Sequence, residues 1–569
     1  MIKKILSSFT FFGTLTMAFS QTQLYIPPTI NSNNINLTLD EGTYQFYPGV
    51  VTNTMGANGN LLGPTIILNK GDFYNITVDN QLSDTTTIHW HGLHVAPEND
   101  GGPHTIILPN DIWNPQFTVL DKAGTYWYHP HLHKKTDKHV SLGIAGMILV
   151  RDSEEASLNL PMSYGVDEFP LVLQTKGFDA NGQIEIHTEN DTSVMVNGIV
   201  DATVDMPAQV VRLRVLNGSS QRVMVFGFSD NRTFSLIGTD GGLLTAPVNL
   251  TRYRLGPGQR IDVLVDLSSD LGQSLQIMSY GSELTNGYYG ATNPGMAPFM
   301  TIPGYNQNPL NGADFQLLNI NVVAQTANPI TTIPATLANY SPIPEANSVK
   351  DRELVFSSAG GMGDLQGPFL INNASMDMNV INEYVPFNNT EIWTLRNQTP
   401  IAHPFHIHDV QFFILDINGN PPPPEMQGLN DVVIVPPGQG TVRFIAIFND
   451  VQNDSIPFMY HCHMLTHEDM GMMGQFLVSD KFMNTEDDEV NQLSIYPNPS
   501  NGSFKVMLFG VNNVQALRIY NLQGKEVFFK YQIETNQISI DLTEKVAKGT
   551  YYVTIQTSDK TYTSKFVIQ

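Results

Sequence analysis

An internal repeat constrains the fold of this chain more than any other feature of its sequence. Three segments near the start return in the same order near the end: 87–91 (TIHWH) as 404–408 (PFHIH), 124–131 (GTYWYHPH) as 458–463 (FMYHCH), and 143–150 (GIAGMILV) as 471–478 (GMMGQFLV). Self-similarity in a fixed order is typical of duplicated structural units. The sequence therefore predicts that the first and last parts of the main body are copies of one unit, with histidines at equivalent places.

The middle third of the chain carries the same framework without the paired histidines. Residues 211–217 (VRLRVLN) resemble 391–397 (EIWTLRN), and residues 256–259 (GPGQ) resemble 436–439 (PPGQ). We expect a third, related unit that has no metal ligands and acts as a spacer.

Short β-rich runs separated by turn residues fill all three units. Residues 212–216 (RLRVL) end at Asn217-Gly218, and residues 261–265 (IDVLV) follow Pro257-Gly258. Many short strands with regular turn signals, and no long run at helical period, indicate an all-β chain of β-sandwiches.

Changes in composition suggest where the domains begin and end. Residues 324–344, rich in Pro, Thr, Ala and Asn, are typical of a linker, and a polar acidic stretch follows residue 483. We expect a signal peptide at 1–20, sandwich domains at 21–160, 161–335 and 336–483, a linker at 484–491, and a small C-terminal β-sandwich at 492–569.

The N-terminus has the features of a signal peptide. Lys3 and Lys4 precede an apolar run over residues 5–19, and Ala18 and Ser20 supply small residues for cleavage before residue 21. A membrane anchor is the alternative, but the run is short for a bilayer span. We expect an exported protein without a membrane span in its mature form.

The charge balance argues against one class of partner. The chain has 29 Lys and Arg against 53 Asp and Glu, a net charge of −24. Nucleic-acid recognition needs clustered positive charge. We therefore expect no nucleic-acid partner.

Histidines gather in four clusters, and each cluster has two histidines separated by one residue. These clusters contain ten of the 15 histidines: His89 and His91; His129 and His131; His403, His406 and His408; His461, His463 and His467. On a strand, this spacing puts both imidazoles on one face, about 7 Å apart along the chain. One such pair is weak evidence of a metal site, whereas four at repeat-equivalent positions are strong evidence.

The only cysteine, Cys462, lies inside the fourth cluster between His461 and His463. Because side chains alternate along a strand, its thiol can face one way while both imidazoles face the other. His467 and Met472 follow, and a set of two histidines, a cysteine and a weak methionine is the ligand set of a blue-copper site. A buried structural cysteine is the alternative.

Together these motifs resemble the multicopper oxidases, the family of laccases, bilirubin oxidases and cuprous oxidases. The resemblance covers about residues 40–480 and is carried by HWHGL at 89–93, WYHPH at 127–131, HPFHIH at 403–408, and the segment from His461 to Met473. It implies three cupredoxin-like Greek-key sandwiches, which agrees with the repeat. It also implies four copper ions, one blue and three in a trinuclear cluster.

The resemblance implies a role for each ligand position. His403, Cys462 and His467 correspond to the ligands of the blue copper, with Met472 axial. His89 and His406 correspond to the mononuclear corner of the cluster. The remaining six histidines correspond to the ligands of its copper pair: His91, His129, His131, His408, His461 and His463.

The family's activity is the one-electron oxidation of a donor coupled to reduction of dioxygen to water. This reduction consumes protons, and Asp100 and Glu468 match acidic positions that deliver them in the family. Ordinary loop carboxylates are the alternative. The five other histidines have no ligand position left, and we expect them to be structural or exposed: His94, His104, His133, His139 and His187.

The electron donor is less constrained. Residues 292–370 contain no dense run of methionines of the kind that cuprous oxidases often carry, which favours a laccase-like enzyme with an organic donor such as a phenol. A metal ion is the alternative, and Met376 and Met378 flank Asp377 as a weak candidate site for it. Relatives that lost copper serve as structural or division proteins, and some cupredoxins only carry electrons or store copper. A complete ligand set argues against all of these non-catalytic roles.

The C-terminal block resembles the sorting domain of type IX secretion. The resemblance rests on residues 496–499 (YPNP), Gly502, 519–521 (IYN) and 549–552 (GTYY). The resemblance implies that the type IX machinery is a partner and that the protein is secreted or held at the cell surface. A generic β-sandwich module is the alternative, in which case the protein is periplasmic.

Overall fold

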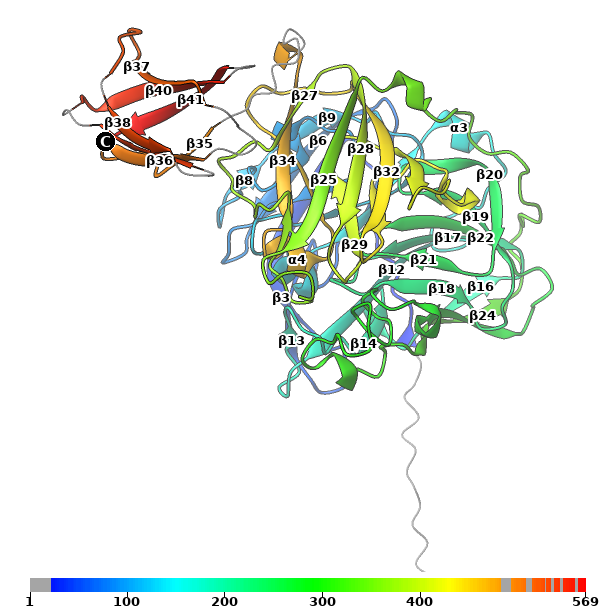
Figure 1. Ribbon diagram of the computed structural model, residues 1–569. Helices are drawn as coiled ribbons and strands as arrows, with labels where there is room; N and C mark the ends of the chain where they lie inside the picture. Colours follow the sequence, from blue (N-terminus) through cyan, green and yellow to red (C-terminus); the bar gives the residue numbers. More distant parts are fainter. Residues whose placement is uncertain are drawn as a thin grey trace, which may run out of the picture. The chain divides into compact units, whose positions relative to one another are not determined.

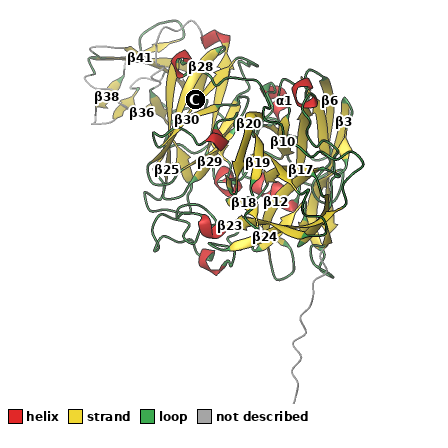
Figure 2. Ribbon diagram, turned by 90° about the vertical axis from the view of Figure 1, so that its right-hand side faces the viewer, coloured by secondary structure: helices red, strands yellow, loops and turns green. Residues whose placement is uncertain are grey.

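The computed structural model describes residues 22–482 and 493–569, apart from 508–513, 528, 534–536, 543–545 and 558–560. The predicted signal peptide and linker thus lie outside the described residues. The chain divides into two compact units, Met1–Met483 and Asn484–Gln569. Strands dominate both, and the described helices are short (Figures 1 and 2). The α-helices are α1 (Pro97–Asp100), α2 (Thr136–Leu142), α3 (Ser153–Ala156) and α4 (Leu465–Asp469).

The larger unit contains three β-sandwiches, so the predicted all-β, three-sandwich fold is confirmed. In the first sandwich, one sheet has the order β2 (Thr29–Ile30), β5 (Thr65–Asn69), β11 (Gly146–Arg151), β10 (Gly124–His129), β7 (His89–His91). The other has the order β4 (Thr52–Ala57), β3 (Asn34–Tyr44), β6 (Phe73–Asn80), β8 (Ile112–Trp113), with β9 (Gln116–Thr118) also on β6. Alternation builds the core, because Ile35, Leu37 and Leu39 of β3 are buried between more exposed neighbours.

The second sandwich is the largest and begins with the first described residues. One sheet has the order β1 (Thr22–Gln23), β16 (Ala202–Pro207), β24 (Asp314–Val323), β23 (Ser274–Tyr280), β18 (Met224–Phe228), β21 (Tyr253–Leu255). The other has the order β15 (Ile199–Val200), β14 (Ser193–Val196), β12 (Glu168–Phe178), β17 (Val210–Asn217), β22 (Arg260–Asp266), β19 (Phe234–Thr239), β20 (Gly242–Leu250), with β13 (Ile184–Glu185) on β12. The chain therefore pairs with the second sandwich before it builds the first.

The third sandwich carries the second copy of the repeat. One sheet has the order β26 (Phe369–Ile371), β25 (Lys350–Ser358), β28 (Asn389–Asn397), β32 (Gly440–Phe448), β30 (Phe413–Ile417). The other has the order β27 (Glu383–Pro386), β34 (Met473–Ser479), β33 (Phe458–Cys462), β29 (His403–Ile407), β31 (Val432–Val435). Strand β33 lies between β29 and β34 just as β10 lies between β7 and β11, with antiparallel pairing throughout. The repeat predicted from sequence is thus present as equivalent three-strand arrays.

An asparagine at the end of one strand organises the same turn in each sandwich. The amides of Asn80, Asn217 and Asn397 each donate to backbone carbonyls across the turn, and each side-chain oxygen accepts from the backbone N–H two residues later. A side chain that bonds its own turn fixes the exit direction of the chain. In the first and third sandwiches the turn leads toward the histidine strands β7 and β29.

The first and third sandwiches are joined by polar contacts. Asp469, at the end of α4, accepts from the backbone N–H groups of Thr136 (2.9 Å) and Asp137 (3.1 Å) at the start of α2. His104 Nε2 lies 2.7 Å from Gln475 Oε1 on β34. These contacts hold the two histidine-bearing sandwiches in one arrangement.

The smaller unit is a separate β-sandwich with its own core. One sheet has the order β35 (Ser494–Tyr496), β36 (Ser503–Met507), β39 (Gln537–Asp541), β38 (Lys530–Ile533), and the other β37 (Ala516–Asn521), β40 (Gly549–Gln556), β41 (Thr561–Ile568). Phe504, Ile519, Val553 and Phe566 are among its buried residues. The predicted C-terminal β fold is confirmed.

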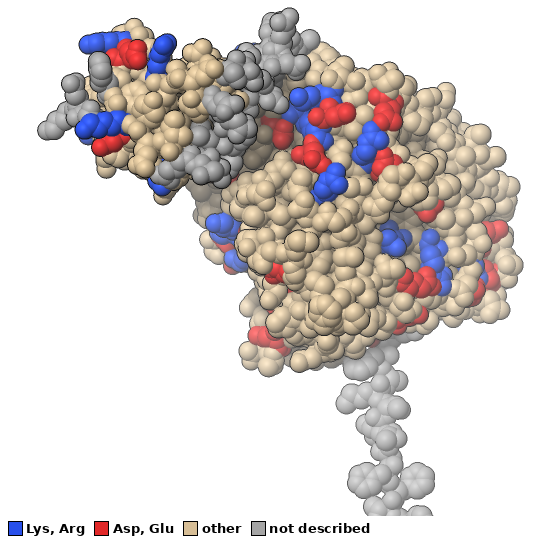
Figure 3. Space-filling model, viewed as in Figure 1, with Lys and Arg blue, Asp and Glu red and all other residues tan. Residues whose placement is uncertain are grey.

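One face of the larger unit carries few charges. On the face drawn in Figure 3, basic and acidic side chains lie beside one another in small groups within wide uncharged areas. No helix among the described residues is both long and apolar enough to cross a membrane.

The contact between His94 and Asp121 predicts a pH dependence of stability. Burial alone would lower the pKa of His94, but Asp121 (2.5 Å from Nδ1) and Asp450 (3.5 Å from Nε2) raise it to about 9. A raised histidine pKa contributes stability that is fully present below the ordinary value of about 6.5 and is lost as pH rises through about 9. We expect His94→Asn to lower the free energy of unfolding by about 2 kcal/mol at pH 6.5, and by much less at pH 9.5.

Denaturant titrations of the wild type and the variant at both pH values measure this difference. Asp121→Asn removes the partner instead of the histidine and should reduce the same pH dependence of the free energy of unfolding. Equal destabilisation at both pH values would show that the ion pair is not the cause.

Candidate metal centres

Strand pairing brings the four histidine clusters together. On β7 and β10, His89 is paired with His129, and on β29 and β33, His406 is paired with His461. Apart from His403, whose ring lies inside the third sandwich, the imidazoles of both arrays lie between the first and third sandwiches, and all are at most 1% exposed. Ligand atoms far apart in the sequence thereby share one buried space.

The fourth cluster divides between two faces of β33, as alternation requires. Cys462 lies in the core of the third sandwich with Phe405, Tyr460 and Met472. The imidazoles of His461 and His463 instead contact histidines of the first sandwich. One tripeptide thus contributes to two separate groups of donor atoms.

The sulfur-containing group lies inside the third sandwich. Cys462 Sγ is 3.5 Å from His403 Nδ1 and 3.6 Å from His467 Nδ1, and the two nitrogens are 3.2 Å apart. Met472 is fully buried, and its backbone carbonyl accepts from the Cys462 N–H at 3.1 Å. Three of the four residues predicted for a blue-copper site therefore converge through their ligand atoms.

Two groups of three nitrogens lie between the sandwiches. In the first group, His91 Nδ1 is 3.3 Å from His129 Nε2 and 3.3 Å from His463 Nε2. In the second, His131 Nε2 is 3.0 Å from His461 Nε2 and 3.1 Å from His408 Nε2. Each group takes histidines from both sandwiches, so neither sandwich alone forms either group.

A third nitrogen group contains His89 and His406. Their ligand atoms lie within 4.8 Å of one another and of His91. His89 Nε2 and His406 Nε2 are buried and have no hydrogen-bond partner among the described residues. An orphaned buried nitrogen is costly unless a ligand occupies it, so these atoms fit a metal ion.

The outer hydrogen bonds of the histidines leave the inner nitrogens free to bind a metal. The Nδ1 atoms of His129 and His406 donate to the backbone carbonyls of Pro130 (2.8 Å) and Asp431 (2.9 Å), so each Nε2 carries a lone pair. His91 is reversed, because its Nε2 faces Asp431 Oδ1 at 3.1 Å and its Nδ1 points inward. Such outer-shell partners are typical of metal-ligating histidines.

Thr399 orients a histidine of the sulfur group in the same way, by bonding its outer nitrogen. Its hydroxyl donates to Asn397 Oδ1 (2.8 Å) or to the Ile401 carbonyl (2.9 Å), and its Oγ1 lies 2.8 Å from His403 Nε2, from which it can accept. His403 therefore donates from Nε2 and keeps the Nδ1 lone pair directed at Cys462 Sγ.

Burial sets the protonation of the donor atoms. It lowers the pKa of His131, His463 and His467 to about 3, which keeps the imidazoles in the neutral form that binds metals. Burial also raises the pKa of the Cys462 thiol far above its ordinary value. A thiolate at this position needs a nearby cation, which a bound metal supplies.

The two predicted carboxylates lie against these histidines. Asp100 Oδ2 accepts from His408 Nδ1 at 2.8 Å, and Asp100 Oδ1 is 3.2 Å from His89 Nδ1. Glu468 lies 3.4 Å from His131 Nδ1 and 3.2 Å from His461 Nδ1. Both carboxylates are almost fully buried.

Two polar residues at the site, Thr399 and Asp431, were missed by the sequence reasoning. Thr399 follows the Asn397 turn, and the equivalent Asn217-Gly218 turn of the second sandwich could have drawn attention to it. Asp431 precedes β31 in no recognisable motif, and only the fold brings it to His91 and His406.

The five remaining histidines lie outside the donor groups. His94 and His187 pair with carboxylates, and His139 lies 3.1 Å from Thr86 Oγ1. His104 contacts Gln475. His133 Nδ1 has no hydrogen-bond partner among the described residues.

Comparison with known families matches four blocks of the chain. Family models described as multicopper oxidase match residues 38–155, 174–287 and 348–481. A model described as a secretion system C-terminal sorting domain matches residues 494–569.

Individual relatives cover most of the larger unit. A multicopper oxidase, mco, of Staphylococcus haemolyticus is 32% identical over 457 residues, 79% of this chain and 89% of the relative. The cell division protein FtsP of Edwardsiella tarda is 31% identical over 468 residues, 81% of this chain and 93% of the relative. The solved structure of the laccase-like multi-copper oxidase CueO from Ochrobactrum sp. is 32% identical with a TM-score of 0.69, covering 80% of this chain and 100% of that one.

The Thr399 contact predicts a selective effect on the sulfur group. Thr399→Val removes the acceptor for His403 Nε2, and outer-shell losses of this kind weaken metal binding by about 10- to 100-fold. We expect weaker Cu(II) binding at the sulfur group, measured by chelator competition, and unchanged binding at the nitrogen groups. Thr394→Val on β28, a half-buried position, is the control. Unchanged affinity would show that Thr399 does not orient His403.

Proposed function

Because the chain belongs to the multicopper oxidase family, we propose that it is an exported oxidase that couples one-electron oxidation of a small organic donor to four-electron reduction of dioxygen to water. Family membership itself supports an oxidoreductase that uses copper. The donor, the acceptor and the arrangement of four copper ions are the proposed parts.

One observation carries the proposal. The tripeptide His461-Cys462-His463 joins the sulfur group to both nitrogen triads through a few covalent bonds. A donor site and an acceptor site that share one strand are suited to electron transfer between them. A storage or purely structural site has no need of this connection.

The donor groups divide into one site for a single ion and one site for three. His403, Cys462, His467 and Met472 would hold the blue copper, and the eight histidines between the sandwiches would hold the other three ions. Bound copper supplies one-electron redox chemistry, so electrons accepted singly can reduce dioxygen in a four-electron reaction. The protein supplies buried, neutral imidazoles and a site closed to bulk water.

Asp100 and Glu468 are proposed to hold protons for water formation. Each carboxylate lies within 3.4 Å of two imidazoles of the nitrogen groups. A buried carboxylate within hydrogen-bond distance of the reacting region is placed to donate a proton.

His467 is the proposed point of entry for electrons. It is 4% exposed, whereas His403 and Met472 are fully buried and Cys462 is 1% exposed. The absence of a dense methionine run in residues 292–370 favours an organic donor such as a phenol. A cuprous or other metal ion is the second candidate.

The FtsP relatives raise a non-catalytic alternative, a role in cell division. The complete and mutually oriented donor groups favour copper binding and oxidase activity instead. The C-terminal match supports export by the type IX machinery, to the cell surface or beyond.

Oxygen uptake tests the function directly. The copper-loaded protein should be blue and should consume oxygen with at least one donor in a panel of phenols, bilirubin and Cu(I). Faster uptake with Cu(I) than with every organic donor would favour the metal-ion candidate. A copper-loaded protein that is colourless and consumes no oxygen would refute the oxidase.

Cys462→Ser tests the connection between the sites. We expect loss of the blue colour and a decrease in oxidase turnover of at least about 1,000-fold, because removing a unique group on the route abolishes the reaction rather than slowing it. The fold should persist, since the residue is small and buried. Met206→Leu, which removes a buried sulfur from the second sandwich, is the control. Full turnover in the serine variant would rule out the proposed route.

Deleting residues 493–569 tests the role of the smaller unit. Because that unit has its own core, the purified remainder should keep its oxidase activity. In cells, surface or extracellular activity should disappear. Loss of activity in the purified protein would instead make the smaller unit part of the enzyme.

A further inference from the structure

Asp431 connects histidines of two sandwiches. Its Oδ1 lies 3.1 Å from His91 Nε2, in the first sandwich, and 3.7 Å from His406 Nδ1, in the third. Its backbone carbonyl accepts from His406 Nδ1 at 2.9 Å. The orientation of both imidazoles therefore depends on where Asp431 is held.

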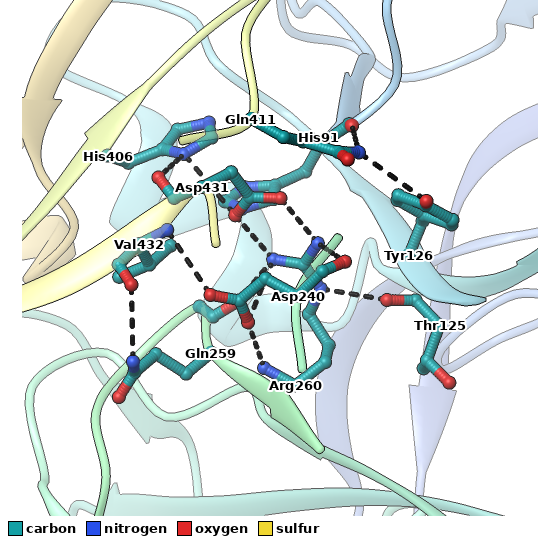
Figure 4. Close-up of polar contacts among 12 residues, drawn as sticks. His91, Thr125, Tyr126, Asp240, Gln259, Arg260, His406, Gln411, Asp431 and Val432 are labelled. Atoms are coloured by element: carbon teal, nitrogen blue, oxygen red, sulfur yellow. Dashed lines mark hydrogen bonds and ion pairs between the residues drawn. The ribbon is translucent and has the colours of Figure 1, made fainter. Parts of the chain in front are cut away.

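Asp431 is held by an arginine of the second sandwich. Arg260, the first residue of β22, donates to Asp431 Oδ1 from Nη1 and to Oδ2 from Nη2, both at 2.6 Å. Both side chains are fully buried. In Figure 4, Asp431 lies between the Arg260 guanidinium and the imidazole of His406. A bidentate arginine–carboxylate pair fixes distance and orientation together.

The other donors of Arg260 are also occupied. Nε donates to the Thr125 carbonyl (3.0 Å), Nη1 to the Gly258 carbonyl (3.1 Å) and Nη2 to the Asp240 carbonyl (3.0 Å). Thr125 belongs to β10, the strand that ends at His129. One guanidinium thus bonds residues of all three sandwiches.

Further hydrogen bonds join the second sandwich to the backbone beside Asp431. Asp240 accepts from the backbone N–H of Arg260 (2.7 Å) through Oδ1 and from that of Val432 (3.3 Å) through Oδ2. Gln259 Nε2 donates to the Val432 carbonyl at 3.3 Å. The chain on either side of the Arg260–Asp431 pair is therefore fixed as well.

Two glycines allow this network to approach the histidines closely. A Cβ on Gly92, directly after His91, would lie 2.5 Å from Asp431 Oδ2 and 2.6 Å from Arg260 Nη2. A Cβ on Gly258 would lie 2.8 Å from the His463 ring. Both glycines have positive φ, which other residues rarely adopt. The second sandwich therefore reaches the nitrogen groups without supplying a ligand.

We infer that Arg260 is a positioning residue for the nitrogen-ligand site: through Asp431 it aligns His91 and His406, so that the second sandwich is needed for metal loading between the other two. This inference rests on the proposed copper sites. It replaces the expectation of a passive spacer with a specific task for the ligand-free sandwich.

Arg260→Lys tests the inference, because lysine keeps the charge but cannot make the bidentate contact. We expect copper affinity at the nitrogen site to decrease by about 10- to 100-fold, the decrease that is typical when the hydrogen-bond partner of a metal-ligating histidine is disturbed. Blue absorbance from the sulfur group should persist, since His403, Cys462 and His467 do not contact the network. Elemental analysis, blue absorbance and electron paramagnetic resonance of the nitrogen-bound copper separate the two sites without an activity assay.

The matched control is Arg222→Lys. Arg222 is also buried in the second sandwich and binds both oxygens of Asp191, but it contacts none of the proposed ligands. It should keep the copper content of the wild type. Equal copper loss in both variants would show a general effect of disturbing the second sandwich and would overturn the inference.

A double variant distinguishes positioning through Asp431 from an independent structural effect. If Arg260 acts through Asp431, Arg260→Lys combined with Asp431→Asn should lose no more affinity than the more affected single variant. Additive losses would overturn the inference. So would wild-type copper affinity in Arg260→Lys, although the proposed function would stand. A wild-type protein that loads no copper would refute the proposed function itself.

Discussion

The site depends on the alternation of side chains along β33. Successive residues of a strand face opposite sides of the sheet, so Cys462 enters the core of the third sandwich while His461 and His463 face the first. A shift of one residue in the pairing of β33 with β29 would put the thiol between the sandwiches and the imidazoles in the core. The pairing of His406 with His461 therefore fixes both donor groups at once.

Duplication explains how eight imidazoles come to face one another. The arrays β7–β10–β11 and β29–β33–β34 share strand order and direction, and each presents paired histidines on its outer face. Burying so many polar rings is tolerable only if their nitrogens are satisfied. Carboxylates and carbonyls satisfy most of the outer nitrogens, and the inner ones are left for metal.

The second sandwich contributes to the site although it supplies no ligand. Some of its buried arginines pair outside it: Arg212 and Arg214 pair with Glu155, just beyond the first sandwich, as well as with Asp262 on β22, and Arg260 pairs with Asp431 of the third. Buried ion pairs are weak evidence of stability but strong determinants of geometry, because a displaced partner leaves an unpaired charge. A site assembled from two separate sandwiches requires that its ligands be held in fixed positions.

The sequence alone determined the fold class, the duplication and the set of residues that meet at the donor groups, because strand period and repeat position are local properties of the chain. It did not determine which nitrogen of each ring faces inward, as the reversal of His91 shows, since that depends on acceptors such as Asp431 that are distant in sequence. Arg260 was likewise beyond reach, because its partners on other sandwiches are chosen by packing between elements. Only the tertiary structure decides such contacts, since hydrogen bonds between sandwiches leave no periodic pattern in the chain that forms them.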